Sequence, residues 1–396
     1  MGGVSTQADA YAVITTTGPD KPGVSAAFFR VLASYSAALV DVEQAIFSGR
    51  ITLAAHTRIP SARAEQIAQE LRNTLSIYGQ QVSVDVREEE SSARARSTHA
   101  VVLMGTEVTA HHVEEVARVL ANFDANIDRI RGLSTSPLTG LELFLSLDGS
   151  AAPVRQALAE LAQQIGIDIA IEPAGLGRRS KRLVCFDCDS TLIQGEVIEM
   201  LAAHAGKEEE VAEITARAMR GELDFEESLR ERVAVLAGLD ASIIDEVARE
   251  IQLTPGARAT IATLNRIGYR TAVVSGGFIQ VLEGLAAEMQ LDYVRANTLE
   301  IADGKLTGRV TGEVVDRKAK EEFLREFAAD SGVGMRQTVA VGDGANDIDM
   351  ITAAGLGIAF NAKPALQEVA DTSVNHRRLD EVLQILGIPA EEVVRG

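Results

Sequence analysis

The chain has 396 residues, of which 46% are hydrophobic and 24% charged, and its formal net charge is −19. This length accommodates about two to four domains, and the acidic balance argues against a nucleic-acid partner. No stretch approaches the roughly 20 apolar residues of a membrane span, and Met1 to Ala8 lack the basic and apolar segments of a secretory leader. We therefore expect a cytoplasmic protein without membrane contact.

The first segment, from Tyr11 to about Glu88, follows the order strand, helix, strand, strand, helix, strand. Apolar periodicity predicts strands at 11–16, 39–46, 51–59 and 81–86, and helices at 24–37 and 62–76. This is the order of a ferredoxin-like βαββαβ domain, to which we assign residues 8–90.

The same order recurs between His99 and about Pro173. Arg30-Val31-Leu32-Ala33 in the first copy matches Arg118-Val119-Leu120-Ala121 in the second. A repeated βαββαβ unit indicates a duplicated domain, so residues 97–175 form the second copy. Between the copies, the charged Ser/Arg-rich stretch from Glu88 to Ser97 is the predicted linker.

The third part, 181–396, begins with the apolar run Leu183 to Phe186, a predicted buried strand that ends at Asp187 and Asp189. Ligands of open parallel sheets bind just beyond the carboxyl ends of the strands. Two carboxylates at that position suit metal binding, nucleophilic attack or proton transfer. The alternative is an Asp-rich turn leading into a helix.

Two neighbouring features have simpler interpretations. Cys185 and Cys188 form a C-x-x-C pattern, but without a second cysteine pair we interpret them as packing and loop residues rather than a redox or zinc site. The basic cluster of Arg178, Arg179, Lys181 and Arg182 more simply marks a domain junction than a binding patch.

Consecutive helices over about 196–253 predict a helical cap above the sheet. The parallel-strand pattern resumes at 270–274 and ends in Ser275-Gly276-Gly277, and Asp303-Gly304 predicts a hairpin. A strand at 337–341 ends in Gly342-Asp343-Gly344-Ala345-Asn346-Asp347, and another follows at 355–360.

These strand ends carry four motifs in a fixed order. They are Asp187-x-Asp189-x-Thr191, Ser275, Lys318 on a predicted helix 318–328, and Gly342-Asp343-x-x-x-Asp347. The set resembles the haloacid dehalogenase-like phosphatase superfamily, and both N-terminal copies resemble ACT domains, which bind amino acids and often pair by edge strands. The expected fold class is therefore α/β. It comprises a Rossmann-like parallel sheet with a helical cap, preceded by two βαββαβ domains.

The resemblance implies a role for each motif residue. Asp187 is the nucleophile that forms an aspartyl phosphate, and Asp189 is the general acid and base. Mg²⁺ is expected on Asp187, Asp343 and the backbone carbonyl of Asp189, held in place by Asp347. Ser275, the Gly276 amide and Lys318 would cradle the phosphoryl oxygens. Lys320 is predicted to lie on the solvent-exposed face of the helix. Asn346 either orients the substrate or shapes a turn.

The cap segments Gln194-Gly195-Glu196 and 218–233 closely resemble the cap of phosphoserine phosphatases. By that resemblance Glu196 pairs with a substrate ammonium, Arg232 with its carboxylate, and Met219 and Phe225 seal the pocket. Alternatively, Glu196 is an ordinary acidic residue in the first turn of a helix, Arg232 is a surface charge, and Met219 and Phe225 belong to the core of the cap. The expected function is Mg²⁺-dependent hydrolysis of O-phosphoserine, the last step of serine synthesis. There are two competing hypotheses: a phosphatase for another small phosphomonoester, and an amino-acid sensor with a silent catalytic domain.

The first repeat joins its first strand and helix by Gly18-Pro19-Asp20-Lys21-Pro22-Gly23. Exposed amides at the helix start suit a carboxylate and Asp20 suits an ammonium, so Gly18, Asp20 and Gly23 form a predicted regulatory site for serine. The second repeat lacks this pattern. We expect the site at a seam between the subunits of a homodimer; the alternative is a tight turn without a ligand.

Overall fold

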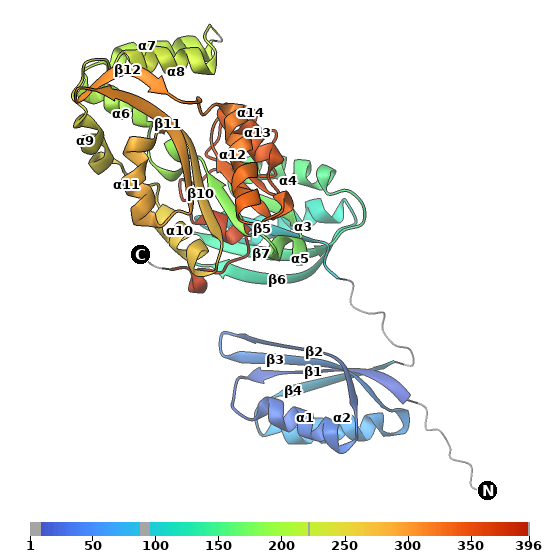
Figure 1. Ribbon diagram of the computed structural model, residues 1–396. Helices are drawn as coiled ribbons and strands as arrows, with labels where there is room; N and C mark the ends of the chain where they lie inside the picture. Colours follow the sequence, from blue (N-terminus) through green and yellow to red (C-terminus); the bar gives the residue numbers. More distant parts are fainter. Residues whose placement is uncertain (1–8, 88–95, 221, 395–396) are drawn as a thin grey trace. The chain divides into compact units, whose positions relative to one another are not determined.

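The computed structural model describes residues 9–87, 96–220 and 222–394 (Figure 1). The chain divides into two compact units, Met1–Ala95 and Arg96–Gly396. Most of the predicted linker, 88–95, lies outside the described residues. The second repeat and the third part thus share one unit, and the predicted three-domain boundaries stay predictions.

The first unit is a four-stranded sheet covered by two helices. Its strand order is β2-β3-β1-β4. The elements are β1 (Asp9–Pro19), α1 (Val24–Ser34), β2 (Ala38–Phe47), β3 (Arg50–Pro60), α2 (Ala64–Ser76) and β4 (Gln81–Arg87). Every second residue of β1, including Ala12 and Ile14, is buried against the helices, as the alternation of side chains along a strand requires.

The predicted regulatory loop lies where β1 passes into α1. A β-carbon on Gly18 would lie 2.7 Å from the carbonyl oxygen of Gly79, so only glycine fits there. Gly23 precedes α1 with φ of 97°, and no side chain caps the helix. Asp20 is exposed, and its amide donates to the Gly49 carbonyl at 2.9 Å. The start of α1 therefore keeps amides without a side-chain cap.

The second repeat has the same sheet order, β6-β7-β5-β8. Its elements are β5 (His99–Gly105), α3 (Ala110–Ala121), β6 (Asn126–Ser134), β7 (Thr139–Ser146), α4 (Ala152–Ile165) and β8 (Asp168–Pro173). Unlike β1, β5 is buried on both faces. Val101 and Leu103 pack on the repeat's own helices, whereas Val102 and Met104 join the core of the third part.

The third part is built on a seven-stranded sheet of order β12-β11-β10-β9-β13-β14-β15. The strands are β9 (Leu183–Phe186), β10 (Arg270–Phe278), β11 (Tyr293–Ala302), β12 (Lys305–Thr311), β13 (Thr338–Gly342), β14 (Gly357–Phe360) and β15 (Thr372–Val374). All pairs are parallel except β11–β12, the predicted hairpin at Asp303-Gly304. The α/β fold class predicted from the sequence is confirmed.

Strand β9 occupies the middle of this sheet, and both of its faces are covered by helices (Figure 1). Leu183 and Cys185 share a core with α12 (Arg317–Asp330) and α13 (Ile348–Ala353), whereas Val184 and Phe186 face α10 (Ala257–Arg266) and α11 (Ile279–Met289). Burial on both faces explains the continuous apolar run that marks β9 in the sequence.

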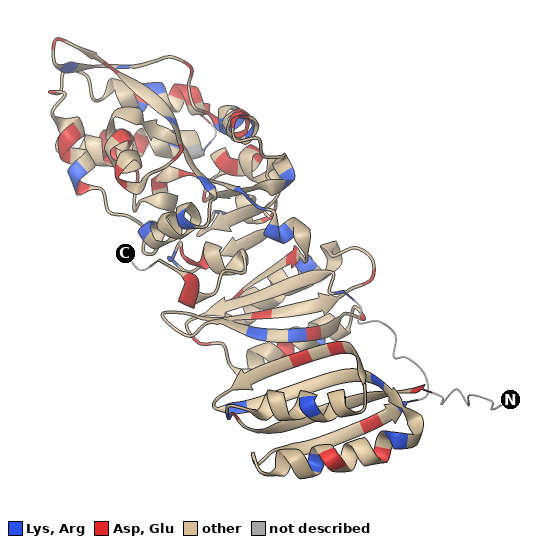
Figure 2. Ribbon diagram, turned by 60° about the horizontal axis from the view of Figure 1, so that its bottom comes forward, with Lys and Arg blue, Asp and Glu red and all other residues tan. Residues whose placement is uncertain are grey.

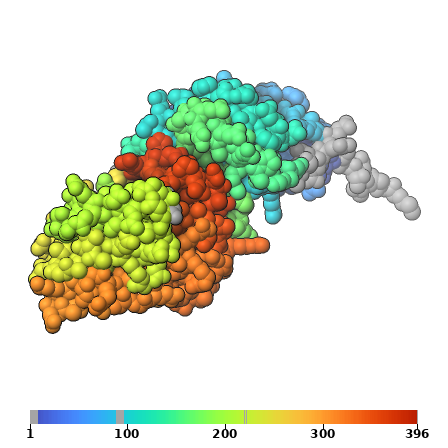
Figure 3. Space-filling model, turned by 90° about the horizontal axis from the view of Figure 1, so that it is seen from above, coloured from blue at the N-terminus to red at the C-terminus, as the bar shows by residue number. Residues whose placement is uncertain are grey.

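The predicted cap consists of α6 (Val197–His204), α7 (Glu208–Met219), α8 (Phe225–Ala234) and α9 (Ile243–Glu250). Asp224 and Glu227 form a capping box that starts α8. The segment between α8 and α9 lies beside the hairpin (Figure 3), and the Gly238 amide donates to the Leu306 carbonyl at 2.8 Å. Acidic and basic residues are interspersed over the cap helices (Figure 2). The cap is thus anchored to the sheet through the β11–β12 hairpin.

The second repeat is joined to the third part by buried polar contacts. Asp168 at the start of β8 accepts hydrogen bonds from the Asn375 amide at 2.7 Å and from His376 Nδ1 at 2.9 Å. Arg178, in α5 (Leu176–Arg179), pairs with the fully buried Glu142 and donates to the Ile385 carbonyl at 3.1 Å in α15 (Glu381–Ile385). These contacts and the shared apolar core make the two parts one unit.

Among the described residues, no helix is both long and apolar enough to cross a membrane.

Candidate active site

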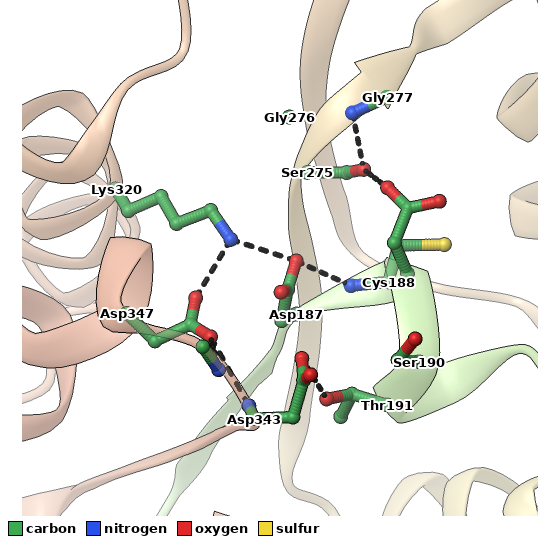
Figure 4. A network of polar contacts seen from close by, with 12 residues as sticks. Asp187, Cys188, Ser190, Thr191, Ser275, Gly276, Gly277, Lys320, Asp343 and Asp347 are labelled. Atoms are coloured by element: carbon green, nitrogen blue, oxygen red, sulfur yellow. Dashed lines mark hydrogen bonds and ion pairs between the residues drawn. The ribbon is translucent and has the colours of Figure 1, made fainter. Parts of the chain in front are cut away.

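The carboxyl ends of β9, β10 and β13 bring together the motif residues predicted on these three strands (Figure 4). β9 lies between the other two strands, and the Asp187 amide donates to the Val341 carbonyl of β13 at 2.8 Å. After Asp187 the chain makes a tight turn, in which Ser190 has φ of 57°. This turn directs Asp187 and Asp189 into the space above the sheet.

The centre of the site is an ion-pair cluster of two aspartates and one lysine. Lys320 Nζ lies 2.7 Å from Asp187 Oδ1 and 2.7 Å from Asp347 Oδ1, and all three side chains are buried. The lysine stands in the second turn of α12, whose start is capped by Asp316 accepting from the Ala319 amide at 2.8 Å.

The placement predicted for Lys318 is wrong. Its side chain is 78% exposed and pairs with Glu322, whereas the side chain of Lys320 has 0% exposure and faces the aspartates. Two residues along a helix turn a side chain by roughly 200°, so only one of the two lysines faces the sheet. The lysine that we assigned to the solvent occupies the site.

Asp343 and Asp347 shape the loop after β13. Asp347 Oδ2 accepts from the amides of Asp343 at 3.1 Å and Gly344 at 3.0 Å. Thr191 Oγ1 donates to Asp343 Oδ1 at 3.3 Å, so the threonine of the Asp187-x-Asp189-x-Thr191 motif holds the Asp343 side chain, a role that the motif alone does not reveal. A β-carbon on Gly342 would lie 2.5 Å from the Asp347 carboxylate, so glycine permits this close packing.

Carboxylate oxygens of Asp187, Asp343 and Asp347 lie within 4.8 Å of one another, as a shared cation would require. Both oxygens of Asp347 already accept hydrogen bonds or ion pairs. One oxygen of Asp187 and one of Asp343 receive no hydrogen bond from the described residues. The donor set therefore fits a hard cation on Asp187 and Asp343, with Asp347 fixing the loop.

Burial and mutual repulsion dominate the electrostatics of this cluster. Burial and the charge of Asp347 hold the pKa of Asp187 well above its usual range, against the opposing effect of Lys320. Burial raises the pKa of Asp343 to about 6, with Asp347 adding to the effect. Burial disfavours the charged form of Lys320, but Asp187 and Asp347 outweigh it and raise the pKa of the lysine. The site thus brings more carboxyl groups together than one lysine can neutralise, which is why burial and mutual repulsion raise their pKa values.

Asp189 connects the sheet to the cap. Its Oδ1 accepts from the amide of Val197, the first residue of α6, at 2.8 Å. Its Oδ2 accepts from Ser275 Oγ at 3.0 Å, and Ser275 Oγ in turn accepts from the Gly277 amide at 2.8 Å. Burial raises the pKa of Asp189 although these two donors lower it. A carboxyl group with a raised pKa is suited to holding a proton for transfer.

The cap supplies Glu196 and Arg232 on the same side as Asp189. Burial and the neighbouring charge of Asp189 raise the pKa of Glu196 to about 7. Burial lowers the pKa of Arg232, while Glu196 and Asp189 favour its charged form. One carboxylate and one guanidinium, both largely withdrawn from water, therefore face the acidic side of the site.

Phe225, the first residue of α8, lies over the phosphate-binding glycine predicted at Gly276. Its Cζ is 3.3 Å from the position that a β-carbon on Gly276 would take. Asn346 is partly buried in the loop between Asp343 and Asp347. Met219 ends α7, and its side chain lies outside the described part of the structure.

Cys185 and Cys188 are buried free thiols, and burial raises the pKa of each. A buried thiol whose pKa is raised is a poor nucleophile and a poor metal ligand. The burial of both cysteines agrees with a role in packing rather than in redox chemistry or zinc binding.

Strand order, cap and aspartate cluster together define a haloacid dehalogenase-like hydrolase, and the model of that family matches residues 184–352. Two ACT-domain models match residues 10–85 and 97–172. The chain is 53% identical over 386 residues to the phosphoserine phosphatase SerB2 of Mycobacterium tuberculosis, covering 96% of this chain and 94% of that protein. It is 51% identical to the phosphoserine phosphatase of Streptomyces coelicolor, covering 95% and 92%. The chain belongs to the phosphoserine phosphatase family.

A solved structure agrees with this assignment. The probable phosphoserine phosphatase from Vibrio cholerae superposes with a TM-score of 0.59 at 33% identity, over 74% of this chain and 88% of that one.

Proposed function

We propose that the protein hydrolyses O-phospho-L-serine to L-serine and phosphate through a phosphorylated Asp187, with Mg²⁺, as the last step of serine synthesis. The observation that carries this proposal is the buried Lys320, 2.7 Å from both Asp187 and Asp347, beside an Asp189 with a raised pKa. Together these groups provide a nucleophile, a cation that faces it and a proton carrier.

Asp187 and Asp343 would hold the metal, with the backbone carbonyl of Asp189 as a further ligand. The small hard cation Mg²⁺ prefers such oxygen ligands. When bound, it would neutralise phosphoryl charge that otherwise repels the attacking carboxylate. Asp347 keeps Asp343 in place by accepting from the Asp343 and Gly344 amides.

In the first half-reaction, a carboxylate oxygen of Asp187 attacks phosphorus and the bond from phosphorus to the serine oxygen breaks. Protonated Asp189 donates its proton to the departing serine oxygen, so the alcohol leaves neutral. Lys320, Ser275 and the Gly276 amide would bind the phosphoryl oxygens, where charge develops in the transition state. In this step Lys320 binds the phosphoryl oxygens, which is the role predicted for Lys318 from the sequence.

In the second half-reaction, Asp189 is a carboxylate and accepts a proton from a water molecule. That water attacks phosphorus of the acyl phosphate, the bond from phosphorus to the Asp187 oxygen breaks, and phosphate leaves. The Val197 amide fixes Asp189 at 2.8 Å and so ties the proton carrier to the first helix of the cap. Closure of the cap and placement of the acid would then be coupled.

Glu196 and Arg232 would select a zwitterionic substrate. An ammonium suits the carboxylate of Glu196, and a carboxylate suits the fork of Arg232. Phe225, packed near Gly276, would exclude water from the bound phosphate. A sugar phosphate offers neither charge, so these two residues favour a phosphorylated amino acid such as phosphoserine over a sugar phosphate. Asn346 would contact substrate or product from the Asp343 loop.

The test is phosphate release from O-phospho-L-serine and a panel of phosphothreonine, sugar phosphates and an aryl phosphate, each with Mg²⁺ or EDTA. We expect phosphoserine to have the highest kcat/KM and EDTA to abolish turnover. If another member of the panel had the highest kcat/KM, that compound would be the substrate and the proposal of phosphoserine would be wrong. Absence of turnover on every member would favour the amino-acid sensor with a silent catalytic domain.

We further propose that serine binds the first repeat near Gly18, Asp20 and Gly23 and changes activity within a homodimer. In support, α1 begins after Gly23 without a side-chain cap and Asp20 is exposed. A carboxylate on the α1 amides and an ammonium on Asp20 would together recognise a free amino acid.

A further inference from the structure

The phosphate-binding segment Ser275-Gly276-Gly277 interrupts the pairing of β10 with β11. Ser275 is opposite Ala296, but Phe278 is opposite Asn297, so Gly276 and Gly277 form a bulge. A bulge releases the backbone from the ladder of hydrogen bonds and redirects it. Something else must therefore fix the orientation of these two peptides.

The side chain of Asn297, on β11, makes that contact. It is 2% exposed, and its Nδ2 donates to the Gly276 carbonyl at 2.8 Å. The amide of the same peptide, on Gly277, donates to Ser275 Oγ at 2.8 Å. Because a peptide unit is planar, hydrogen bonds at its carbonyl and at its amide fix the plane between Gly276 and Gly277.

Asn297 also reaches the helix that carries the lysine. Its Oδ1 accepts from the amide of the buried Val315 at 2.8 Å. The next residue, Asp316, caps α12, and Lys320 follows in the second turn. The buried side-chain carboxamide of Asn297 thus connects the bulge at Gly276 to the start of α12, the helix that carries Lys320.

We propose that Asn297 is a positioning residue that sets the phosphate-binding bulge at Gly276 against the start of α12, and thereby against Lys320. It acts through these two elements and does not touch the substrate. The proposal rests on the phosphatase function proposed above, but it holds for any phosphomonoester, because every such substrate places its phosphoryl group between the bulge and the lysine.

The test compares N297D with a matched control, N265D. The two side chains have similar roles at opposite ends of the sheet, since Asn265 Nδ2 donates to the Gln290 carbonyl at 3.1 Å and its Oδ1 accepts from Thr271 Oγ1 at 3.0 Å. Each substitution keeps the shape of the side chain and replaces the NH2 group that donates to a backbone carbonyl by a carboxylate oxygen. Thermal unfolding of both variants measures the purely structural effect, and kcat and KM are measured on phosphoserine and on p-nitrophenyl phosphate.

We expect N297D to lower kcat by about a hundredfold on both substrates while KM for phosphoserine stays nearly unchanged. N265D should retain wild-type kcat in its folded fraction. A kcat of N297D equal to that of N265D would overturn the proposal, and so would a loss confined to phosphoserine. If wild type cleaves only the aryl phosphate, the function proposal fails, yet the comparison of the two variants still decides the role of Asn297.

Should N297D fail to fold, N297A decides. The truncated side chain leaves room for water to reach the Gly276 carbonyl and the Val315 amide, so folding is less affected. A lowered kcat on both substrates supports the positioning role, and an unchanged kcat rejects it.

Discussion

At the scale of single residues, the lysine of the active site was readable from helix periodicity. In α12 the buried residues include Lys320, Leu324, Phe327 and Ala328, which are spaced four, three and one residues apart and share one face. Lys318 lies off that stripe and pairs with Glu322 on the exposed side. Motif order indicates only that a lysine follows Ser275, whereas the apolar stripe indicates which one faces the sheet.

K320M and K318M separate the two lysines. K320M removes the cation between Asp187 and Asp347, and we expect kcat on phosphoserine to fall by about a thousandfold. K318M removes only an exposed pair with Glu322 and should leave kcat unchanged. Steady-state kinetics on both variants, with circular dichroism as a check of folding, makes the comparison. Equal activities of the two variants would contradict the assignment of Lys320.

At the scale of elements, the helical character of residues 196–253 could be predicted because the helix ends carry strong local signals, such as Asp224 and Glu227 at the start of α8. The proximity of Glu196 and Arg232 could not be read from the sequence, since it depends on how α6 and α8 pack. The close approach of Phe225 to Gly276 likewise depends on where the cap meets the sheet.

Arg232 and Arg230 lie on the same helix and form a natural pair of variants. R232A should weaken the transition-state binding of phosphoserine by about 2–5 kcal/mol, because the carboxylate of the bound substrate loses its partner in the buried pocket. R230A breaks only the exposed pair with Glu226 and should change little. Measurements of kcat/KM on phosphoserine and on an aryl phosphate provide the test. If R232A impaired both substrates equally, the arginine would support the cap fold and would not recognise the substrate.

At the scale of the whole molecule, the sequence held an unused signal for the joining of the second repeat to the catalytic part. Strand β5 is apolar almost throughout, with the run Ala100 to Met104, whereas in β1 the apolar residues Ala10 to Ile14 are followed within the strand by Thr15, Thr16 and Thr17. An uninterrupted run indicates a strand covered on both faces. The polar side of the junction, with Glu142 between two arginines, depends on tertiary contacts and was not predictable.

R178A tests this junction. Removing Arg178 leaves the buried Glu142 with one fewer partner and the Ile385 carbonyl without its donor, so we expect unfolding of the second unit to cost about 3–5 kcal/mol less. R179A, at an exposed neighbouring position, should stay within about 0.5 kcal/mol of wild type. Denaturant unfolding monitored by circular dichroism measures both values. Equal stabilities would mean that the polar contacts at the junction add nothing to the apolar core.

The serine site is best tested by a cut between the two compact units. Calorimetric titration of serine into the full chain and into an Arg96–Gly396 chain should show binding that depends on the first repeat, with phosphatase activity retained by the shorter chain. A cut at Lys181 would instead remove the second repeat and expose the apolar surface of the third part that β5 covers. Serine binding that survives removal of residues 1–95 would place it elsewhere, for instance in the active site as a product.

The most direct test of the account is the mass of the protein during turnover. Wild type mixed with phosphoserine and Mg²⁺ and quenched in acid should carry one added phosphoryl group, and peptide mapping should place it on Asp187. D187N should fold, carry no phosphoryl group and release almost no phosphate, because an amide cannot form the acyl phosphate. A phosphoryl group on another residue, or substantial turnover by D187N, would contradict the mechanism.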